Sequence, residues 1–309
     1  MRMNGVVLTE IDLNGYDFGD VKVEKINNKT ISHFNGNADV IAIVGCRATA
    51  NKILSMHFPS LKLFQLTSAG FDTIPLEEYS KRGIWLCNAG DVYSTPIAET
   101  VVYGMLKYAK RYWNSPKKFF LRPFRGYKYI DELFGKKLLV MGCGRIGTAV
   151  AKRSAAFDME VYGYDCFPVG RPEYKEVYTS KEELLKNMDN FDYIVTTIPL
   201  MDSTKGFLDA SIFSSMKKSA VIVNVGRRGI FNDSDLYRAL KTKSIGGAVL
   251  DMFEKVPNPI TNKYRRLKNV LVLPGVSAIS IPVKKRLADH VAKNLNLLID
   301  DAKPLFCVN

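Results

Sequence analysis

The sequence of 309 residues contains few histidines, few cysteines and no long apolar run. The histidines, His33, His57 and His290, are too few and too scattered to predict a metal site. The five cysteines are an odd number without the C-x-x-C spacing of zinc sites, and most lie in or beside apolar segments. We therefore expect buried reduced thiols rather than disulfides or a zinc centre.

No stretch approaches the roughly 20 apolar residues that a membrane span requires, and the N-terminal sequence MRMNGVVLTEIDLNG lacks the apolar core of a secretory signal. We expect a cytoplasmic protein with no membrane contact. The chain also has no internal repeat and no low-complexity segment. Its composition, 47% hydrophobic and 24% charged, is typical of globular proteins, and its length suits two domains.

Acidic residues are in the minority, since the chain has 31 Asp and Glu but 44 Lys and Arg. Its net charge is therefore +13. Such a charge is typical of nucleic-acid-binding proteins, and it would also attract a small anionic substrate. The basic residues are spread along the chain, with one modest cluster at 117–128 among aromatic residues. A solvated basic face is the commoner cause of this pattern, so we do not expect a nucleic-acid partner.

Residues 138–165 carry the most informative pattern of the chain. The apolar run 138–141 predicts a buried strand, and the sequence GCGRIG at 142–147 follows it directly and opens a predicted helix. In such a G-x-G-x-x-G turn the first glycine permits a tight turn, the second lets a pyrophosphate approach the backbone, and the third lets helix and strand pack closely. The positive end of the helix then faces the phosphates.

Asp165 ends the next predicted strand, 161–164, and stands eighteen residues after Gly147. A carboxylate at this place can bind both hydroxyls of an adenosine ribose and would repel a 2′-phosphate. The next two residues, Cys166 and Phe167, bring no arginine that would attract one. The pattern therefore predicts NAD(H) binding, with NAD favoured over NADP. The alternative is a doubly wound domain that has lost its ligand.

Short apolar runs alternate with helical spacers along the whole chain, which predicts an α/β protein with parallel sheets covered on both faces. In the first part we predict strands at 6–8, 21–24, 40–44, 61–66 and 84–87 and helices at 48–57 and 75–82. A long helix at 96–111 connects this part to the cofactor domain. There we predict six or seven strands, among them 138–141, 161–164, 192–197, 220–225, 246–250 and 270–273, with helices at 182–187, 210–216 and 233–241. We expect the last helix, 283–302, to return to the first domain.

Residues 112–134 are rich in aromatic and basic side chains but have weak periodicity. This pattern predicts an irregular arm rather than a core element. Such an arm could pack on a second subunit through its aromatic residues, or it could be a solvated loop.

Ligands of doubly wound sheets bind beyond the carboxyl ends of the strands, so the residues that follow each strand are candidates for ligand binding. These are 68–72, 198–200, 226–229, 251 and 274–275. Arg227 follows one such strand and offers a fixed fork for a carboxylate, with a surface salt bridge as the alternative. Small residues at 68–70 can bring backbone amides to the same anion.

Seven motifs, in order, carry a resemblance to a known family: TSAGFDTIP (67–75), CNAGDVYSTPIAET (87–100), FGKKLLVMGCGRIG (134–147), TTIPLMDSTKGFLD (196–209), MKKSAVIVNVGRRGIFNDSDLYRAL (216–240), GGAVLDMFEKVPNP (246–259) and NVLVLPGVSAIS (269–280). Over nearly its whole length the chain resembles the D-isomer-specific 2-hydroxyacid dehydrogenases. The resemblance implies a Rossmann cofactor domain inserted into a smaller flavodoxin-like substrate domain, and a homodimer. We place the first part of the substrate domain at 1–94, the NAD-binding domain at 95–277 and the C-terminal part of the substrate domain at 278–309.

The resemblance also implies the site residues, with NAD(H) in the cleft between the domains. Ala69 and Gly70 would hold the substrate carboxylate, and Arg227 would clamp the carboxylate and the carbonyl as the catalytic residue. The predicted cofactor-binding residues are Gly142, Gly144, Arg145, Ile146, Gly147, Asp165, Pro199, Thr204, Val225 and Asp251, of which Asp251 would contact the nicotinamide end.

The proton-handling pair of the family, a histidine after the last strand and a glutamate before the proline of the D-x-F-E-x-E-P motif, is missing here. Gly275, in LPGVS, replaces the histidine, and Val256, in DMFEKVP, replaces the glutamate. No slip of one residue restores them, since the nearest histidine is His290 on the following helix and Glu254 occupies an earlier position of the motif.

Two smaller departures from the family are Arg228, where a glycine is usual, and Asn232, where an aspartate is usual.

A positioned general acid or base contributes roughly a hundredfold to ten-thousandfold to rate, so the missing pair leaves three readings open. Ser277, Ser280, Tyr93 or a bound water could donate the proton; the chemistry could involve hydride alone, as with a formate-like donor; or the protein could bind NAD(H) without turnover. We favour an NAD-dependent oxidoreductase that acts on a small anionic 2-oxo or 2-hydroxy acid with altered proton chemistry. The alternative is a catalytically weak or inactive NAD(H)-binding homologue with a sensor or regulatory role.

Overall fold

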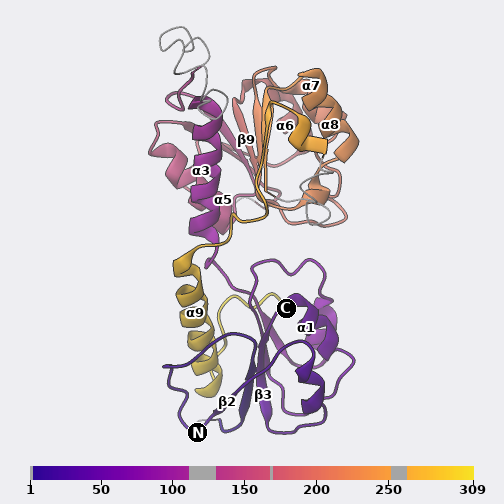
Figure 1. Cartoon of the computed structure of the whole chain (residues 1–309), viewed down its shortest axis with the longest axis vertical. Helices are drawn as coiled ribbons and strands as arrows, with labels where there is room; N and C mark the ends of the chain where they lie inside the picture. Colours follow the sequence, from indigo (N-terminus) through magenta and orange to yellow (C-terminus); the bar gives the residue numbers. More distant parts are fainter. Residues whose placement is uncertain (1–2, 111–129, 168–169, 252–262) are drawn as a thin grey trace. The chain divides into compact units, whose positions relative to one another are not determined.

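The computed structural model describes residues 3–110, 130–167, 170–251 and 263–309. The chain divides into two compact units, which Figure 1 labels by their helices and strands. Unit 1 consists of Met1–Tyr93 and Ile279–Asn309, and unit 2 of Ser94–Ala278. Unit 2 is therefore inserted into the chain of unit 1.

Unit 1 is built on a five-stranded parallel sheet in the order β2-β1-β3-β4-β5. The strands are β1 (Val6–Thr9), β2 (Lys22–Lys25), β3 (Val40–Gly45), β4 (Leu63–Leu66) and β5 (Trp85–Cys87). Strands β3 and β4 are buried along their whole length, as expected in the middle of a parallel sheet. The polar Gln65 of β4 is also buried, and its amide donates to the carbonyls of Leu66 and Asn88. The strand order is that of flavodoxin-like folds, which confirms the predicted fold class of this part.

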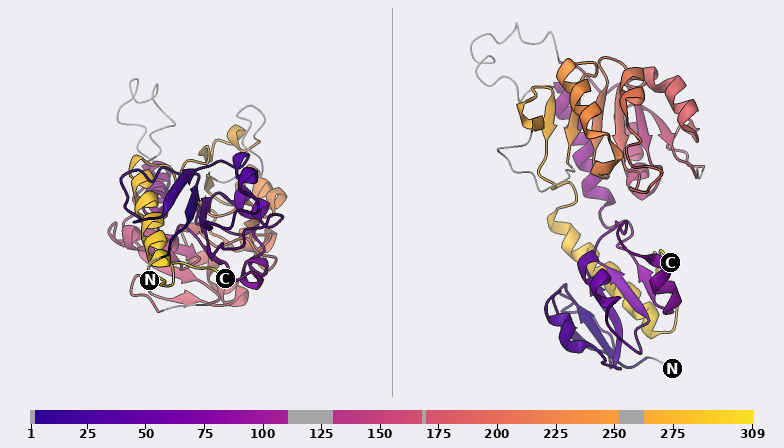
Figure 2. Two further views of the ribbon diagram at one scale, coloured as in Figure 1. Left: turned by 90° about the horizontal axis from the view of Figure 1, so that it is seen from below. Right: turned by 90° about the vertical axis from the view of Figure 1, so that its right-hand side faces the viewer.

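Helices cover both faces of the unit 1 sheet (Figures 1 and 2). Helices α1 (Arg47–Ile53) and α2 (Leu76–Lys81) cover one face, and their residues Ile53 and Tyr79 pack in a cluster with strand residues such as Phe64. Helix α9 (Ile281–Ile299) covers the other face through an apolar stripe that includes Leu287, Val291 and Leu295. The prediction that the last helix returns to the first domain is confirmed.

Unit 2 is built on a seven-stranded parallel sheet in the order β12-β11-β10-β9-β6-β7-β8. The strands are β6 (Lys137–Met141), β7 (Glu160–Tyr164), β8 (Val177–Tyr178), β9 (Tyr193–Thr196), β10 (Val221–Asn224), β11 (Gly247–Leu250) and β12 (Val270–Val272). The order runs outward from β6 in both directions, which is the arrangement of a Rossmann sheet. The switch of direction lies between β6 and β9, where ligands of such sheets bind.

Helices also cover both faces of the unit 2 sheet (Figure 1). Helices α3 (Ser94–Lys110) and α5 (Arg145–Ala155) pack against each other on one face, and α6 (Lys181–Asn187), α7 (Ala210–Ser215) and α8 (Asp233–Thr242) cover the other. The second face holds a core in which Leu184, Phe213 and Leu240 meet strand residues such as Ile194 and Ile222.

Short 3-10 helices lie at Thr30–Phe34 (η1) in unit 1 and at Met188–Asn190 (η4), Arg228–Ile230 (η5) and Lys263–Arg266 (η6) in unit 2.

Two predictions from the sequence concern segments that the structure covers only in part. Most of the predicted arm 112–134 lies outside the described residues, and its described part, 130–134, forms neither helix nor strand. Val256 and Glu254 also lie outside the described residues.

The prediction that the cysteines are buried is only partly right. All five cysteines are free thiols. Cys87 and Cys143 are buried, Cys46 and Cys307 are half-buried, and Cys166 is exposed. Cys166 is exposed because it follows the last residue of strand β7 and Asp165, where the chain has already left the sheet.

Candidate functional site

The turn between strand β6 and helix α5 has the backbone that its three glycines predict. Gly142 adopts a φ of +95°, a conformation that L side chains rarely adopt. A Cβ on Gly147 would lie 1.9 Å from the carbonyl oxygen of Gly142, so only glycine permits this packing of helix on turn. A Cβ on Gly144 would meet nothing within 4 Å. Gly144 therefore borders open space, and a pyrophosphate group has room to approach the backbone there.

Helix α5 begins at this turn without a side-chain cap among the described residues. Its N-cap is Gly144, and Arg145, Ile146 and Gly147 form its first turn. The N–H groups of a first helical turn have no partner inside the helix, and they carry the positive end of the helix dipole. This end of α5 can therefore bind an anionic group such as a pyrophosphate.

Asp165 is tied to the glycine turn by its carboxylate. One oxygen accepts a hydrogen bond from the backbone N–H of Cys143 at 2.9 Å, and the other accepts one from the N–H of Phe167 at 2.9 Å. Each carboxylate oxygen has a further lone pair that can accept from a ribose hydroxyl. The half-buried carboxylate is thus oriented beside the turn by the backbone, and its charge disfavours a 2′-phosphate.

Arg171 and Tyr174 lie close to the same turn, and neither was expected from the sequence. Burial raises the pKa of the Cys143 thiol to about 11, against the opposing effects of the nearby Tyr174 hydroxyl and of the charge of Arg171. The Nε of Arg171 is buried and has no partner among the described residues. No periodicity marks this arginine, because it stands in the irregular segment between β7 and β8.

Hydrogen bonds connect the glycine turn to the end of strand β9. The hydroxyl of Thr197 donates to the carbonyl of Gly142 at 2.9 Å. In the loop that follows, the hydroxyl of Thr204 donates to the carbonyl of Pro199 at 2.7 Å and accepts from the N–H of Met201 at 2.8 Å. Pro199 is exposed, so this loop presents it to solvent at the switch point of the sheet.

The end of strand β10 is organised by Asn224, whose side chain is fully buried. Its Oδ1 accepts from the hydroxyl of Thr196 at 2.6 Å and from the N–H of Gly226 at 3.1 Å. Its Nδ2 reaches the carbonyl of Arg227 at 3.5 Å. Sequence reasoning missed Asn224, although a polar residue at the end of an apolar strand was a signal for such a role.

Arg227 is half-buried and stands in extended backbone just before η5. Its Nη1 donates to the carbonyl of Gly226 at 3.2 Å. A Cβ on Gly226 would lie 2.9 Å from the carbonyl of Thr196, so the loop passes close to strand β9 before it reaches the arginine. Val225, also predicted to contact the cofactor, is buried.

Asp251 follows strand β11 and is 1% exposed. Its two carboxylate oxygens accept hydrogen bonds from the N–H groups of Val276 and Ser277, each at 3.0 Å. The N–H of Asp251 itself donates to the carbonyl of Asn224 at 3.0 Å. Asp251 therefore holds the loop after strand β12 against the end of strand β10.

Gly275 lies in that loop with a φ of +75°. A Cβ there would have room, because its nearest neighbour is the carbonyl oxygen of Asp251 at 3.8 Å. The left-handed backbone nevertheless costs a side-chain-bearing residue roughly 1–2 kcal/mol. A histidine would thus be strained in this conformation, so the loop is adapted to the glycine.

The proton donors considered from the sequence differ in their surroundings. The hydroxyl of Tyr93 donates to the carbonyl of Thr67 at 2.5 Å, and burial raises its pKa. Ser277 is buried beside Asp251, and the buried hydroxyl of Ser280 has no hydrogen-bond partner within the described ranges. Nε2 of His290 lies 3.0 Å from the carbonyl oxygen of Asn88, so this histidine is engaged within unit 1.

Ala69 and Gly70 lie in unit 1, in the bend that follows strand β4. The carbonyls of this bend have partners: Asn88 donates its Nδ2 to Ala69 at 3.0 Å, and the hydroxyl of Ser68 donates to Gly70 at 2.9 Å. The carbonyl of Ser68 accepts from the N–H of Ala89 at 3.1 Å. Because a trans peptide directs its N–H opposite to its C=O, the N–H groups of Ala69 and Gly70 point away from these contacts. They can bind an anion.

Within unit 2 the predicted residues therefore gather at the carboxyl edge of the sheet, joined from Asp165 through Gly142 and Asn224 to Asp251. Ala69 and Gly70 belong to unit 1 and to the carboxyl edge of its own sheet.

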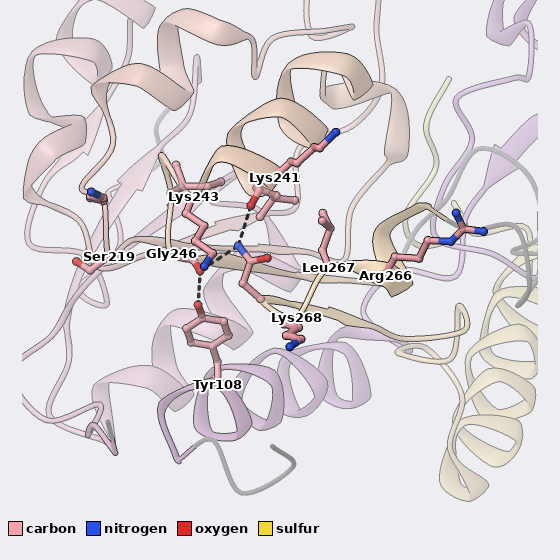
Figure 3. Close-up of a pocket in the computed structure, with 12 residues that line it drawn as sticks. Tyr108, Ser219, Lys241, Lys243, Gly246, Arg266, Leu267 and Lys268 are labelled. Atoms are coloured by element: carbon pink, nitrogen blue, oxygen red, sulfur yellow. Dashed lines mark hydrogen bonds between the residues drawn. The ribbon is translucent and has the colours of Figure 1, made fainter. Parts of the chain in front are cut away.

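A cavity of about 560 Å³ lies elsewhere in unit 2, lined by residues that precede strands β10, β11 and β12. The carbonyl of Gly246, which lines the cavity, already has hydrogen-bond partners. It accepts from the hydroxyl of Tyr108 at 2.5 Å and from Asn269 at 3.3 Å. Its rim carries cations, but Figure 3 shows the charged ends of Lys241, Arg266 and Lys268 pointing in different directions. The cavity thus lies at the amino edge, away from the candidate site.

Groups of three or more residues that could hold a metal ion are absent from the part of the chain that the structure describes. In the same part, none of the helices is long and apolar enough to cross a membrane.

Comparisons with known proteins agree with this geometry. Residues 104–277 match the family described as D-isomer specific 2-hydroxyacid dehydrogenase, NAD binding domain. The chain is 30% identical over 245 residues to a glyoxylate reductase of Korarchaeum cryptofilum, covering 77% of this chain and 73% of that protein. It is 32% identical over 275 residues to a D-3-phosphoglycerate dehydrogenase of Methanocaldococcus jannaschii, covering 85% of this chain and 50% of that protein.

A solved structure resembles the chain over its whole length. It is a D-isomer specific 2-hydroxyacid dehydrogenase family protein from Aeromonas salmonicida, with a TM-score of 0.84 and 25% identity, and the match covers 100% of this chain and 99% of that one. The likeness thus extends beyond the cofactor domain to both units.

Proposed function

Since the chain belongs to the D-isomer specific 2-hydroxyacid dehydrogenase family and is an NAD-dependent oxidoreductase, we propose that Arg227 binds the carboxylate of its substrate, a small 2-oxo or 2-hydroxy acid. The observation that carries the proposal is the convergence of the glycine turn, Asp165, Arg227 and Asp251 on the carboxyl edge of one sheet. When bound there, NAD(H) would supply or accept the hydride.

The cofactor fits the residues present. The open backbone at Gly144 and the first turn of α5, Arg145 to Gly147, would bind the pyrophosphate, and Asp165 would bind the adenosine ribose. Pro199, Thr204 and Val225 would contact the cofactor near the switch point of the sheet. The role we assign to Asp251 is to hold the loop 275–277 in place at the nicotinamide end.

The substrate is a small anionic acid. The two relatives described above are named for glyoxylate reduction and 3-phosphoglycerate dehydrogenation, and a carboxylate is the group that these substrates share. Arg227 offers a charged fork for it, and the outward N–H groups of Ala69 and Gly70 offer further donors. We propose a 2-oxo acid of about the size of glyoxylate as the first substrate to test.

The proton chemistry differs from that of the family because Gly275 has no side chain to donate a proton and its backbone disfavours one. Arg227 would still polarise the substrate carbonyl and orient the acid for hydride transfer, which contributes through proximity and electrostatics. The proton would then come from another group, with Tyr93, Ser277, Ser280 and a bound water as the candidates.

The test is NADH oxidation by the purified protein with a panel of 2-oxo acids. We expect turnover in the parent and a loss of at least a hundredfold in kcat/KM in Arg227→Ala, because a charge-assisted bidentate contact is removed. Arg238→Ala is the matched control, since this arginine is 70% exposed on helix α8, and it should retain parental activity. Equal activity in Arg227→Ala and the parent would refute the assignment.

A second candidate function is supported by the same Gly275 backbone: an NAD(H)-binding homologue with weak or no turnover and a regulatory role. It predicts that NADH binds with ordinary affinity in a calorimetric titration while no 2-oxo acid is reduced. Turnover at an ordinary enzymatic rate that depends on Arg227 excludes it.

We further propose that the protein is a homodimer, as the family resemblance implies, and that it acts in the cytoplasm. Sedimentation equilibrium of the full chain tests the dimer, and a single species at the mass of one 34.7 kDa chain would refute it.

A further inference from the structure

Residues 306–309 pair with strand β5, which is the edge strand of the unit 1 sheet. The N–H of Asn88 donates to the carbonyl of Phe306 at 3.0 Å, and the N–H of Val308 donates to the carbonyl of Leu86 at 2.8 Å. These two bonds close an isolated antiparallel bridge in which Cys87 stands opposite Cys307.

The position of the two bonds sets the geometry of the cysteine pair. Because the bonds join the neighbours of Cys87 and Cys307, the cysteines form a non-hydrogen-bonded pair, whose Cα atoms lie about 4.5 Å apart and whose side chains project to the same side. Disulfides span Cα distances of about 4.4–6.8 Å. The backbone therefore already has the separation that a disulfide needs.

Further contacts hold the pairing segment in place. The side chain of Asn309 accepts from the N–H of Leu86 and donates to the carbonyl of Ile84, both at 2.8 Å. The ammonium of Lys303 lies 4.8 Å from the ring centre of Trp85. Both partners of the bridge are thus anchored on either side of the thiols.

The two thiols have different environments. Cys87 is fully buried, and Cys307 is half-buried with its sulfur 3.3 Å from the carbonyl oxygen of Pro304. A hydrogen bond from the Cys87 thiol lowers the pKa of Cys307, assisted by the charge of Lys303 and opposed by burial. The same hydrogen bond, together with burial, raises the pKa of Cys87. Cys307 is therefore the more accessible and more acidic thiol, and Cys87 is its resolving partner.

We propose that Cys87 and Cys307 form a reversible dithiol site that a small disulfide such as oxidised glutathione converts into an intramolecular disulfide. The thiolate of Cys307 attacks one glutathione sulfur, which forms a mixed disulfide and releases one glutathione thiolate that takes up the Cys307 proton. Cys87 then loses its proton and attacks the sulfur of Cys307, which releases the second glutathione. The two cysteines together lose two electrons and two protons. The glutathione disulfide takes up these electrons and protons and becomes two glutathione thiols.

The disulfide would fix residues 306–309 to the strand that leads into Asn88, whose side chain holds the carbonyl of Ala69. Its formation does not depend on the proposed function, so a failure of one does not refute the other. Any effect on turnover rests on the role proposed for Ala69.

The test uses the full chain, incubated with glutathione disulfide, unfolded in the presence of N-ethylmaleimide, digested and analysed by mass spectrometry. We expect a peptide pair joined through Cys87 and Cys307 to become the main form, and to disappear after reduction. The variant Cys166→Ser, which lacks the exposed thiol, is the matched control and should give the same linked pair. Cys307→Ser should lose it.

Two outcomes would overturn the proposal. One is that Cys87 and Cys307 are both alkylated in the oxidised sample. The other is that Cys307 carries glutathione while Cys87 is alkylated. As a second measurement, the oxidised parent should unfold several degrees above the reduced parent, whereas Cys307→Ser should show no such shift. An oxidised parent with an unchanged or lower Tm would contradict the claim that the native backbone accommodates the bond.

Discussion

At the scale of single residues, Asp165 decides cofactor affinity and selectivity in our assignment. Asp165→Ala removes the acceptor of the ribose hydroxyls and the hydrogen bond from Cys143, so we expect NADH to bind roughly 10- to 100-fold more weakly. The loss of the repelling charge should also narrow the preference for NADH over NADPH. Fluorescence titration of both cofactors measures this, with Asp189→Ala in η4, at the opposite edge of the sheet, as the control. An unchanged NADH affinity in Asp165→Ala would refute the assignment of Asp165 to the adenosine ribose.

Asn88 positions the bend that we assign to the substrate carboxylate. Its side chain is 6% exposed, donates to Ala69 and accepts from the N–H of Gly90 at 2.9 Å. Asn88→Ala should raise KM for a 2-oxo acid about tenfold, while the Kd for NADH stays at the parental value. Asn51→Ala, an exposed asparagine of helix α1, should change neither. A change in NADH affinity equal to the change in KM would indicate a general loss of structure instead.

The sequence predicts candidate site residues where the chemistry follows from local spacing. The glycines of the turn and Asp165 belong to one short segment, and a strand end points to Arg227. Asn88 and Asn224 were missed because their partners lie in other segments of the chain, and only folding brings them together. At Asn224 the sequence offered a signal, a polar residue at the end of an apolar strand, but the partner of the amide is known only once the neighbours of each strand end are known.

At the scale of elements, the turn before helix α5 predicts that substitution of Gly147 lowers stability, whereas substitution of Gly144 weakens cofactor binding. In Gly147→Ala the new Cβ would collide with the carbonyl of Gly142, so we expect a loss of about 1–3 kcal/mol of stability or more. In Gly144→Ala the Cβ meets open space, so the fold should persist while NADH binding weakens. Urea unfolding and NADH titration of both variants check this. Equal destabilisation by the two substitutions would contradict the proposed division of roles.

Helix α7 predicts a response to acid. Burial would raise the pKa of Asp209, but hydrogen bonds from Lys181, Ser211 and Ile212 outweigh it and lower the pKa to about 2. Because the folded pKa lies below the unfolded value of 3.8, the ionised carboxylate stabilises the fold above about pH 4, and this contribution disappears as the pH falls towards 2.

The variant Asp209→Asn should therefore be less stable than the parent at pH 7, and the difference should shrink between about pH 4 and pH 2. Urea midpoints at a series of pH values measure it. A difference that stays constant across this range would show that the carboxylate charge does not contribute.

The order of strands and helices could be predicted because most core strands are short, largely apolar runs. Strand β8, at Val177–Tyr178, was not predicted individually, since two residues at the edge of a sheet leave no periodic pattern. Its formation depends on pairing with Gly163 and Tyr164 of strand β7. The exposure of Cys166 could not be predicted either, because it depends on where the chain leaves the sheet.

At the scale of the whole molecule, the net charge of +13 predicts a salt effect on catalysis. A positive protein attracts an anionic substrate over distances that salt screens, so kcat/KM for a 2-oxo acid should fall as ionic strength rises from about 0.01 to 0.15 M. The kcat at saturation should change little. A neutral ester of the same acid serves as the control, and an equal salt effect on both substrates would refute electrostatic attraction as the cause.

The insertion of unit 2 into unit 1 also has a consequence for synthesis on the ribosome. One face of the unit 1 sheet is covered by helix α9, whose residues emerge only after all of Ser94–Ala278. The part of unit 1 that precedes Ser94 therefore keeps an uncovered apolar face until helix α9 has been synthesised. Unit 2 has every strand of its sheet available before that point and can fold earlier. The nascent chain is thus most exposed to aggregation in the segment that precedes unit 2, and the speed at which unit 2 is translated sets how long that exposure lasts.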